Sequence, residues 1–431
     1  MTKKIYALVD CNNFYVSCER VFNGNLENKP VAVLSNNDGC FIARSNEVKA
    51  LGIPMGAPLY QWQDLVDKEG IIVFSANFPL YGDMSHRVMK TLEEMCPDLE
   101  IYSIDEAFLD LTNMHLSSVT DYCRLIKETV ERWTGIPVSV GVGPTKTLAK
   151  AASKLAKKIK SNNGVFNFLD YPDTKENDEY LSKVEVGDVW GIGRKYTKLL
   201  NRYNIINACD LKNADPVFIK QRLTVTGERT QMELSGIACI PVNRNPHPKK
   251  AIAVTRSFGK YQKTLQELSE SVAYFTRKIG EKLRAQESAA NYLQVFILTN
   301  LHRKDHPQYH NSVIVKLAKP SDYSPLLIAA ALQGLKNIFR TGFSYKKAGV
   351  LALALQPKDL IQYSFLEPTP ETQKNAEAKL MKTVDGINRR VGADVLKYAA
   401  EGVTRGWWMN QTHKSKRYTT KWAEILQAKL T

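Results

Sequence analysis

Two adjacent carboxylates inside an apolar stretch constrain the fold more than any other feature of the chain. Asp105 and Glu106 lie within 101–109, a segment whose other residues have the character of a β-strand. Neighbouring charges in a half-buried hairpin repel each other and are costly to desolvate. The fold must therefore either leave them in a solvated turn or place positive charge beside them, which a divalent cation would supply.

A third carboxylate ends another apolar segment. Ile5–Val9 is typical of a buried strand and is followed directly by Asp10. If the two strands are neighbours, Asp10, Asp105 and Glu106 offer the hard oxygen ligands that suit Mg²⁺, an ion that also takes substrate phosphates as ligands. Two such ions about 3.5–4 Å apart activate an attacking oxygen and stabilise a leaving group. The alternative is that Asp10 is only a turn or capping acid.

The charge balance favours a polyanionic partner. The chain has 59 Lys and Arg residues against 44 Asp and Glu residues, a formal net charge of +15. Nucleic acid is the commonest partner of such a protein, although the excess can also serve solubility alone. Lysines at four-residue spacing predict a cationic helical stripe that could face phosphates or merely solvent. Its members are Lys146, Lys150, Lys154 and Lys158.

The chain is too long for one hydrophobic core. It has 431 residues, and single cores rarely exceed about 250–300 residues. The first 165 residues alternate strand and helix patterns, including a helix over 84–94, and predict an α+β sheet layered with helices and interrupted by an insertion. A proline-rich basic stretch at 243–250 is typical of a linker. Strands and helices mix again over 251–356, and a polar tail follows from 357.

Nothing in the sequence indicates a membrane or secreted protein. No apolar run approaches the roughly 20 residues of a spanning helix, and Ile5–Val9 is too short for a secretory signal. The 7 cysteines include no CxxC pair, which argues against a disulfide framework or a zinc site. We therefore expect a cytoplasmic protein with no membrane partner.

Several motifs resemble those of the Y-family translesion DNA polymerases. Residues 10–19, 103–108 and 139–150 are similar to three motifs of that family, and 33–44 resembles the UmuC branch, the catalytic subunit of bacterial DNA polymerase V. Further matches lie at 188–194, 256–259, 347–350, 385–388 and 417–420. The resemblance covers essentially the whole chain.

The resemblance implies a multidomain α+β fold, a right-hand polymerase with a ferredoxin-like palm, small fingers, a helical thumb, an α/β little finger and a C-terminal tail. The implied domains are a palm at 1–20 and 76–165, fingers at 21–75, a thumb with a helix-hairpin-helix-like turn at 166–242, a linker at 243–250, a little finger at 251–356 and a tail at 357–431. Small fingers imply an open site that tolerates damaged templates.

The resemblance also implies a catalytic site. Asp10, Asp105 and Glu106 would be the catalytic acids and would bind two Mg²⁺ ions with help from the Cys11 backbone carbonyl. Tyr15 stands at the position of the steric gate, the ring that excludes a ribose 2′-OH. The other residues implied to bind the nucleotide are Phe14, Asn46, Lys49 and Lys157.

Two further sets of residues are implied to bind macromolecules. A Gly-hydrophobic-Gly turn would let backbone N–H groups approach a DNA phosphate without reading bases; its residues are Gly191, Gly193, Arg194 and Lys195. A stretch in the tail resembles the sliding-clamp-binding motif of bacterial polymerases, with Gln362, Phe365 and Leu366 as its contact residues.

The implied function is template-directed, error-prone translesion synthesis in the SOS response, with dNTP transferred to a primer 3′ end. Implied partners are primed or damaged DNA, dNTP, UmuD-type subunits, a sliding clamp and a RecA-type filament. A polymerase IV-type enzyme is disfavoured by the long tail and by 33–44. A non-catalytic DNA-binding factor that kept the fold would be expected to lose the acids, and a metal-dependent nuclease would leave Tyr15 unexplained.

Overall fold

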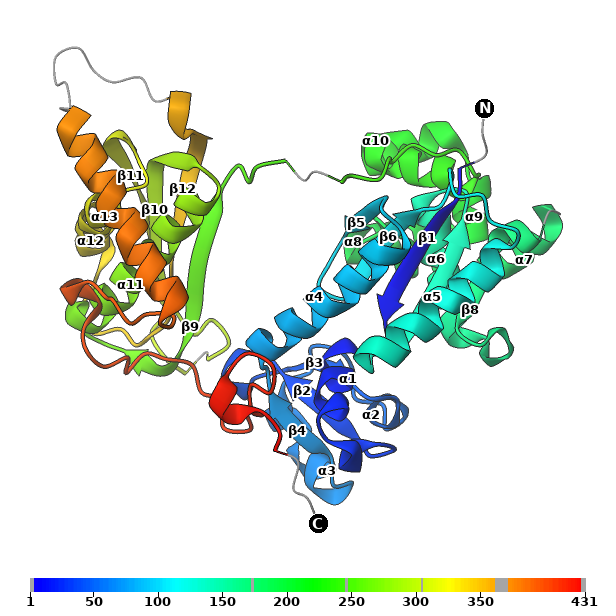
Figure 1. The fold of residues 1–431 in the computed structure, drawn as a ribbon, viewed down its shortest axis with the longest axis horizontal. Coiled ribbons are helices and arrows are strands. Elements are labelled where there is room, and N and C mark those ends of the chain that lie inside the picture. Colours follow the sequence, from blue (N-terminus) through cyan, green and yellow to red (C-terminus); the bar gives the residue numbers. More distant parts are fainter. Residues whose placement is uncertain (1–3, 172–173, 245–246, 304, 361–370, 428–431) are drawn as a thin grey trace. The chain divides into compact units, whose positions relative to one another are not determined.

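The chain forms two compact units, each with its own hydrophobic core. The computed structural model describes residues 4–171, 174–244, 247–303, 305–360 and 371–427 (Figure 1). The first unit comprises residues 1–35, 39–246 and 413–431, and the second comprises 36–38 and 247–412. The second unit thus begins within the segment expected as a linker.

A five-stranded sheet organises the first unit. Its order is β5 (Leu99–Ile101), β6 (Glu106–Asp110), β1 (Tyr6–Cys11), β7 (Val138–Gly143) and β8 (Val165–Asn167). The central strand β1 is antiparallel to both of its neighbours. The two acidic strands are therefore adjacent, which is the arrangement that a shared carboxylate site requires.

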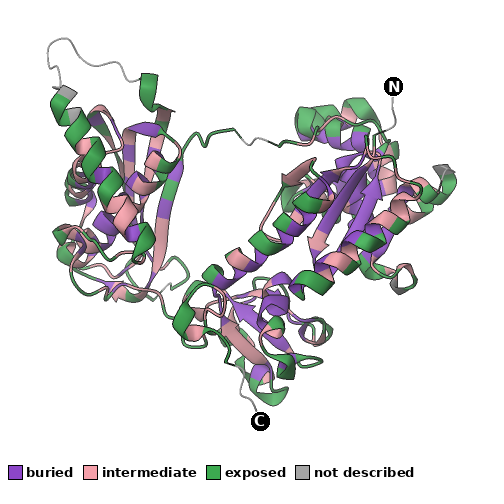
Figure 2. Ribbon diagram, viewed as in Figure 1, coloured by how far each residue is buried: buried purple, intermediate pink, exposed green. Residues whose placement is uncertain are grey.

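Helices cover both faces of this sheet. Helices α4 (Phe78–Met95) and α5 (Val119–Thr134) pack on one face, and α6 (Lys146–Lys158) packs on the other. Figure 2 shows the buried strands between the helices. Leu8 lies in the cluster on the α6 side, and alternate residues of a strand share a face. Asp10 is therefore directed toward the same side as α6.

The glycines of β7 permit a close approach between strand and helix. A Cβ atom on Gly141 would lie 2.0 Å from the Ser153 nitrogen and 2.3 Å from the Ala149 carbonyl oxygen of α6. No side chain fits in that space. The glycine-rich segment before α6 therefore serves helix–sheet packing, and it fixes the distance at which the lysines of α6 stand from the strand ends.

A smaller sheet is inserted between β1 and α4. Its order is β3 (Phe41–Arg44), β2 (Val31–Leu34) and β4 (Ile72–Ser75), with β2 and β4 parallel. Helix α1 (Phe14–Val21) leads from β1 into it. The other helices here are α2 (Asn46–Ala50) and α3 (Gln63–Lys68). This insertion carries Asn46 and Lys49, two of the residues that the sequence resemblance implies to bind the nucleotide.

A helical subregion follows the five-stranded sheet. Its helices are α7 (Thr174–Ser182), α8 (Arg194–Asn201), α9 (Ala208–Asn213) and α10 (Pro216–Leu234). The buried Glu233 of α10 accepts hydrogen bonds from the N–H and hydroxyl of Thr147, at 2.9 and 2.8 Å. This carboxylate at the N-terminus of α6 anchors the helical subregion to the sheet.

The second unit is a four-stranded antiparallel sheet packed against helices. Its order is β11 (His310–Ser321), β10 (Ser288–Thr299), β12 (Tyr345–Pro357) and β9 (Ile252–Gln262). Helices α11 (Leu265–Ala285) and α12 (Ser324–Ile338) bury their apolar sides in its core.

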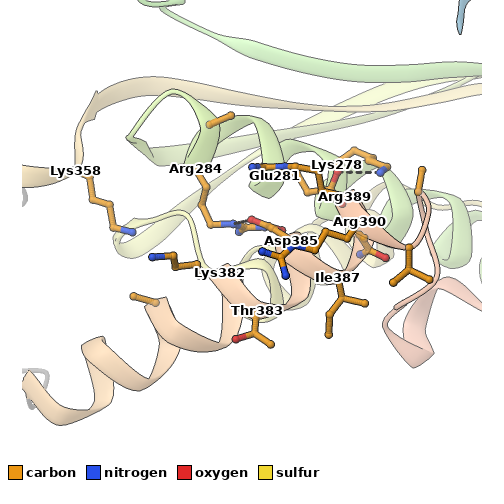
Figure 3. A pocket seen from close by; sticks show the side chains of 16 residues that line it. Lys278, Glu281, Arg284, Lys358, Lys382, Thr383, Asp385, Ile387, Arg389 and Arg390 are labelled. Carbon is orange, nitrogen blue, oxygen red and sulfur yellow. Dashed lines mark hydrogen bonds and ion pairs between the residues drawn. The ribbon is translucent and has the colours of Figure 1, made fainter. Parts of the chain in front are cut away.

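The segment expected as a single tail is divided between the two units. Helix α13 (Glu371–Arg390) packs in the second unit, where Asp385 pairs with Arg284 of α11 at 2.6 Å beside a cavity of about 1190 Å³ (Figure 3). Residues 413–427 belong instead to the first unit. The tail is therefore two structural elements rather than one domain.

Two further features concern the chain as a whole. All 7 cysteines are free thiols. Among the helices of the described ranges, none is long and apolar enough to cross a membrane.

Candidate active site

Two of the three predicted acids face each other across neighbouring strands, and each is paired with a lysine of α6. Asp10 on β1 is the cross-strand partner of Glu106 on β6. The Lys157 ammonium lies 2.5 Å from Asp10 Oδ1, and the Lys150 ammonium lies 3.0 Å from Glu106 Oε2. The end of the sheet therefore presents two carboxylates and two ammonium groups within one cluster.

The lysine stripe of α6 lies against the protein's own acids. Lys146 is buried and pairs with Glu100 at 2.7 Å, while Lys154 pairs with Asp188. The sequence allowed this stripe to face phosphates or solvent. Lys146 and Lys150 instead pair with acids of β5 and β6, and the partly exposed Lys154 pairs with Asp188, which lies outside the sheet.

The third acid is held by a serine that the sequence analysis missed. The carbonyl oxygen of Asp105 accepts a hydrogen bond from the Cys11 N–H at 2.8 Å. The Ser103 hydroxyl donates to Asp105 Oδ1 at 2.5 Å and accepts from the backbone N–H groups of Asp105 and Glu106, at 3.2 and 3.1 Å. Serine two residues before an acid is a known turn signal that could have indicated this contact.

Electrostatics set the protonation of the central acid. Burial raises the pKa of Asp10 to about 6, Lys157 lowers it, and the neighbouring Glu106 raises it. Desolvation is the largest of these effects, because it disfavours the charged carboxylate. Added positive charge next to Asp10 would therefore stabilise its ionised form.

The donor chemistry of this cluster fits a divalent cation. Carboxylate oxygens at adjacent strand ends are the ligands that Mg²⁺ prefers. Within the described ranges, however, no three His, Cys, Asp or Glu side chains stand together as a ready ligand set. The carboxylates of Asp10 and Glu106 instead contact lysine ammonium groups, and that of Asp105 contacts Ser103. The cluster thus supplies oxygen ligands suited to a divalent cation. In this structure the ammonium groups of Lys150 and Lys157 provide the positive charge beside two of the acids.

A second missed residue joins the small sheet's helix α2 to this cluster. Asn13 accepts a hydrogen bond from the Lys49 ammonium at 2.5 Å and donates to Asn46 Oδ1 at 3.1 Å. Desolvation lowers the pKa of Lys49, and the Lys157 ammonium lowers it further, so the two cations stand near each other. Asn13 has a φ of 49°, a left-handed conformation that asparagine tolerates better than most residues.

The aromatic residues that follow form a stack beside the acids. Phe14 is buried in the core, and Tyr15 next to it is only partly buried. The Tyr15 ring stacks on Tyr81 of α4, with centroids 4.6 Å apart and planes 17° apart. Phe78 meets Tyr15 edge-on at 6.0 Å. The sequence missed both partners because the predicted helix began at residue 84, whereas α4 begins at Phe78.

The ring of Tyr15 lies within electrostatic reach of the third acid. Burial raises the pKa of the Tyr15 phenol, and the negative charge of Asp105 raises it further. The structure therefore brings Asp10, Glu106, Asp105 and Tyr15 into one neighbourhood, with the cations of α2 and α6 beside it.

The predicted DNA-contacting turn lies in the helical subregion. Gly191 has a φ of 89°, which only glycine adopts without strain, and Gly193 is the N-cap of α8. Arg194 and Lys195 begin α8 and are exposed. This turn is separate from the acid cluster in sequence and in the elements that carry it.

The predicted clamp-binding residues fall outside the described residues. These are Gln362, Phe365 and Leu366.

Comparisons with known proteins agree across the chain. Residues 9–154 match the family described as impB/mucB/samB, residues 249–365 match the C-terminal domain of that family, and 378–428 match a domain of unknown function. The protein SamB of Salmonella typhimurium is 38% identical over 99% of this chain and 100% of its own length. The protein UmuC of S. typhimurium strain LT2 is 38% identical with the same coverage.

More distant relatives are named as polymerases. DNA polymerase IV 2 of Bacillus subtilis is 27% identical over 94% of this chain and 96% of its own length. Among solved structures, a Y-family DNA polymerase chimera of Dbh and Dpo4 matches with a TM-score of 0.63 and 20% identity, over 82% of this chain and 99% of the other. An insertion ternary complex of Dbh DNA polymerase matches with a TM-score of 0.55, 20% identity and the same coverage.

Proposed function

Because this chain belongs to the impB/mucB/samB family, the UmuC-like branch of the Y-family DNA polymerases, we propose that it copies damaged, primed DNA by translesion synthesis. The chain is a DNA-directed DNA polymerase with the α+β fold of that family. Beyond this activity, we propose which residues form the site and that they hold metal ions. We also propose that the synthesis is error-prone and takes place in the cytoplasm as part of the SOS response.

One observation carries the assignment of the site. Asp10 and Glu106 are cross-strand partners at the end of β1 and β6, with Asp105 beside them and the Tyr15 ring nearby. Three carboxylates next to a ring on a helix N-terminal turn are what a nucleotidyl-transfer site needs to hold metal ions on one side and a sugar on the other. The pairing of Asp10 with Glu106 supports this assignment, because it joins strands that are almost 100 residues apart in sequence.

We assign Asp10, Asp105 and Glu106, with the Cys11 carbonyl, as the groups that would hold two Mg²⁺ ions. When bound, such ions neutralise the triphosphate and lower the barrier for attack by a primer 3′ oxygen. The chain's own contribution is position and charge. Ser103 holds the carboxylate of Asp105, and Lys150 balances the charge of Glu106.

The nucleotide is assigned to the space between α1, α2 and α6. Lys49 and Lys157 supply positive charge for the triphosphate, with Asn13 and Asn46 holding Lys49 in place. Lysine is a point charge without the fork of arginine, so these contacts provide attraction more than geometry. Tyr15 excludes a ribose 2′-OH by contact, and Phe14 supports that ring from the core.

The partners follow the same reasoning. The net charge of +15 favours DNA, and the turn at Gly191–Lys195 is assigned to template or primer phosphates. The relation to UmuC supports UmuD-type subunits and a RecA-type filament as partners. A sliding clamp is proposed on the motif at 362–366.

Primer extension past an abasic site tests the proposal. Wild-type protein and Asp105→Ala are compared with Mg²⁺, dNTP and a primed template, alone and with UmuD-type and RecA-type partners. We expect the wild type to extend the primer beyond the lesion. The extension rate of Asp105→Ala should be lower by at least about 100-fold. Asp121→Ala is the matched control, because Asp121 is an exposed acid of α5 whose ion pair with Arg124 lies along its own helix.

The outcomes separate the alternatives. Extension that survives in Asp105→Ala would contradict the assigned site. No extension by the wild type under any of these conditions, with DNA binding intact, would favour a non-catalytic DNA-binding role.

A further inference from the structure

Residues 413–420 pack in the first unit beside the small sheet. The backbone N–H of Ser75, at the end of β4, donates to the carbonyl of His413 at 3.0 Å, and the His413 N–H donates to the Ser75 hydroxyl at 3.0 Å. Five residues farther on, the Tyr418 ring stacks on Phe22 with centroids 4.8 Å apart and planes 13° apart. We call residues 413–420 the tail strap.

The tail strap accepts hydrogen bonds from the side-chain amide of Asn77, the residue at the start of α4. Asn77, the fully buried N-cap of that helix, donates to the Ser415 hydroxyl at 2.9 Å and to the carbonyls of Ser415 and Lys416 at 3.2 and 3.1 Å. Its side chain makes no capping bond to α4 itself. The position of the first turn of α4 is therefore fixed from outside the helix, by a segment that lies more than 330 residues later in the chain.

The same serine reaches the helix that carries the predicted sugar-selecting ring. The Ser415 hydroxyl donates to Glu19 Oε1 of α1 at 2.9 Å. The Tyr81 hydroxyl donates to that same oxygen at 2.6 Å. Glu19 is 2% exposed, and a buried carboxylate is costly unless donors surround it. Burial raises the pKa of Glu19, and the bonds from Tyr81 and Ser415 lower it, so both donors stabilise the charged form.

Tyr81 is the ring on which Tyr15 stacks. A continuous set of contacts thus runs from Ser415 through Glu19 and Tyr81 to Tyr15. A second route runs from Ser415 through Asn77 to the first turn of α4, which carries Phe78 against the edge of Tyr15. The first route therefore ends on the face of Tyr15 that Tyr81 covers, and the second ends at an edge-on contact between Phe78 and Tyr15.

We propose that the tail strap is a positioning element for sugar selection, in which Ser415 holds Glu19 and Asn77 so that Tyr81 and Phe78 support the Tyr15 ring. This inference rests on the proposed function, because it uses Tyr15 as the ring that meets the sugar. A ring excludes a 2′-OH only when its backing is rigid, since a shift of about 1 Å relieves the contact. The strap thereby gives residues 413–420 a role in substrate choice.

Single-nucleotide insertion with dNTP and rNTP tests this role. The measured quantity is the ratio of kcat/KM for dCTP to that for CTP opposite template G, in full-length protein with Mg²⁺. Ser415→Ala should lower this ratio by about three- to tenfold, the range of one net hydrogen bond, while kcat/KM for dCTP changes less. Ser415→Thr keeps the hydroxyl and should restore the ratio. Thr420→Ala removes an exposed hydroxyl of the same strap and should leave the ratio unchanged.

A double-mutant cycle distinguishes support of Tyr15 from a general loss of structure. In a Tyr15→Ala background the ring is gone, so Ser415→Ala should cause no further fall in the ratio. Additive effects would overturn the proposal, as would an unchanged ratio in Ser415→Ala and in Tyr81→Phe. If Tyr15→Ala itself leaves sugar selection intact, the assignment of the gate fails instead. If Ser415→Ala proves unstable, Tyr81→Phe tests the same route, because it removes one hydroxyl and keeps the ring stack.

Discussion

At the scale of single residues, Asp10 determines how the site responds to pH. Its pKa of about 6 exceeds the ordinary value of 3.8 because the carboxyl is buried. A metal ion needs the ionised form. As the pH falls from 7.5 through 6, protons therefore compete with the metal, and binding should weaken by up to about tenfold for each pH unit below 6.

Mn²⁺ takes the same oxygen ligands and can be titrated into DNA-free protein by electron paramagnetic resonance. The control variant is Lys157→Met. Lys157 lowers the pKa of Asp10, so its removal should move the loss of binding to higher pH. An affinity for Mn²⁺ that stays constant between pH 7.5 and 5.5 would contradict this account.

The acids could be singled out from the sequence because the desolvation cost of charged residues in an apolar segment is visible from their immediate neighbours. Asp105 and Glu106 stand out in a strand-like segment, and the pairing of β1 with β6 brings Asp10 to Glu106 as expected. Ser103 and Asn13 were not predicted, since their importance depends on a turn geometry and on one left-handed residue. Both features belong to the folded backbone, and neither changes the hydrophobic pattern.

At the scale of elements, the position of α6 on β7 is the most sensitive packing contact of the site. Gly141→Ala would place a Cβ 2.0 Å from the backbone nitrogen of Ser153. Helix α6 must then move away from the sheet, carrying Lys150 and Lys157 with it. We expect a loss of about 3 kcal/mol in the free energy of unfolding of the first unit and a fall in polymerase activity.

Urea unfolding measures this loss, and Gly82→Ala is the matched control. A Cβ on Gly82, within α4, would meet nothing within 4 Å. That substitution should be neutral or stabilising by about 0.5–1 kcal/mol. A Gly141→Ala protein as stable as the wild type would show that α6 does not depend on this close approach.

The elements themselves followed from periodicity only in part. The strand predicted at 5–9 matches β1 closely, whereas the strand-like segment 101–109 is divided between the end of β5 and most of β6. The start of α4 was misplaced, because Phe78-Pro79-Leu80-Tyr81 contains a proline and aromatic residues that read as a turn. In the structure the proline occupies the first turn of the helix, where a missing N–H costs nothing.

At the scale of the whole molecule, the chain passes between its two units more than once. The segment at 243–250 leads from the first unit to the second, and the chain returns at His413. The sequence predicted the linker from its prolines and charge. It did not predict the return, because the tail strap is polar and its contacts are hydrogen bonds to residues at 19, 75 and 77.

This return predicts that the protein survives cleavage of its linker. A site-specific protease sequence placed within 243–250 would cut the chain into two fragments, and the second would still contain the tail strap. The strap stacks Tyr418 on Phe22 and makes hydrogen bonds with Glu19 and Asn77, so we expect the fragments to stay together in size-exclusion chromatography at micromolar concentration. The same cleavage in a chain that ends at residue 412 should weaken the association, because residues 36–38 of the first fragment still contact the second unit, as in the bond from the Asn37 side chain to the Ser257 carbonyl. Separation of the fragments with the strap present would contradict its docking, and so would an equally strong association without it.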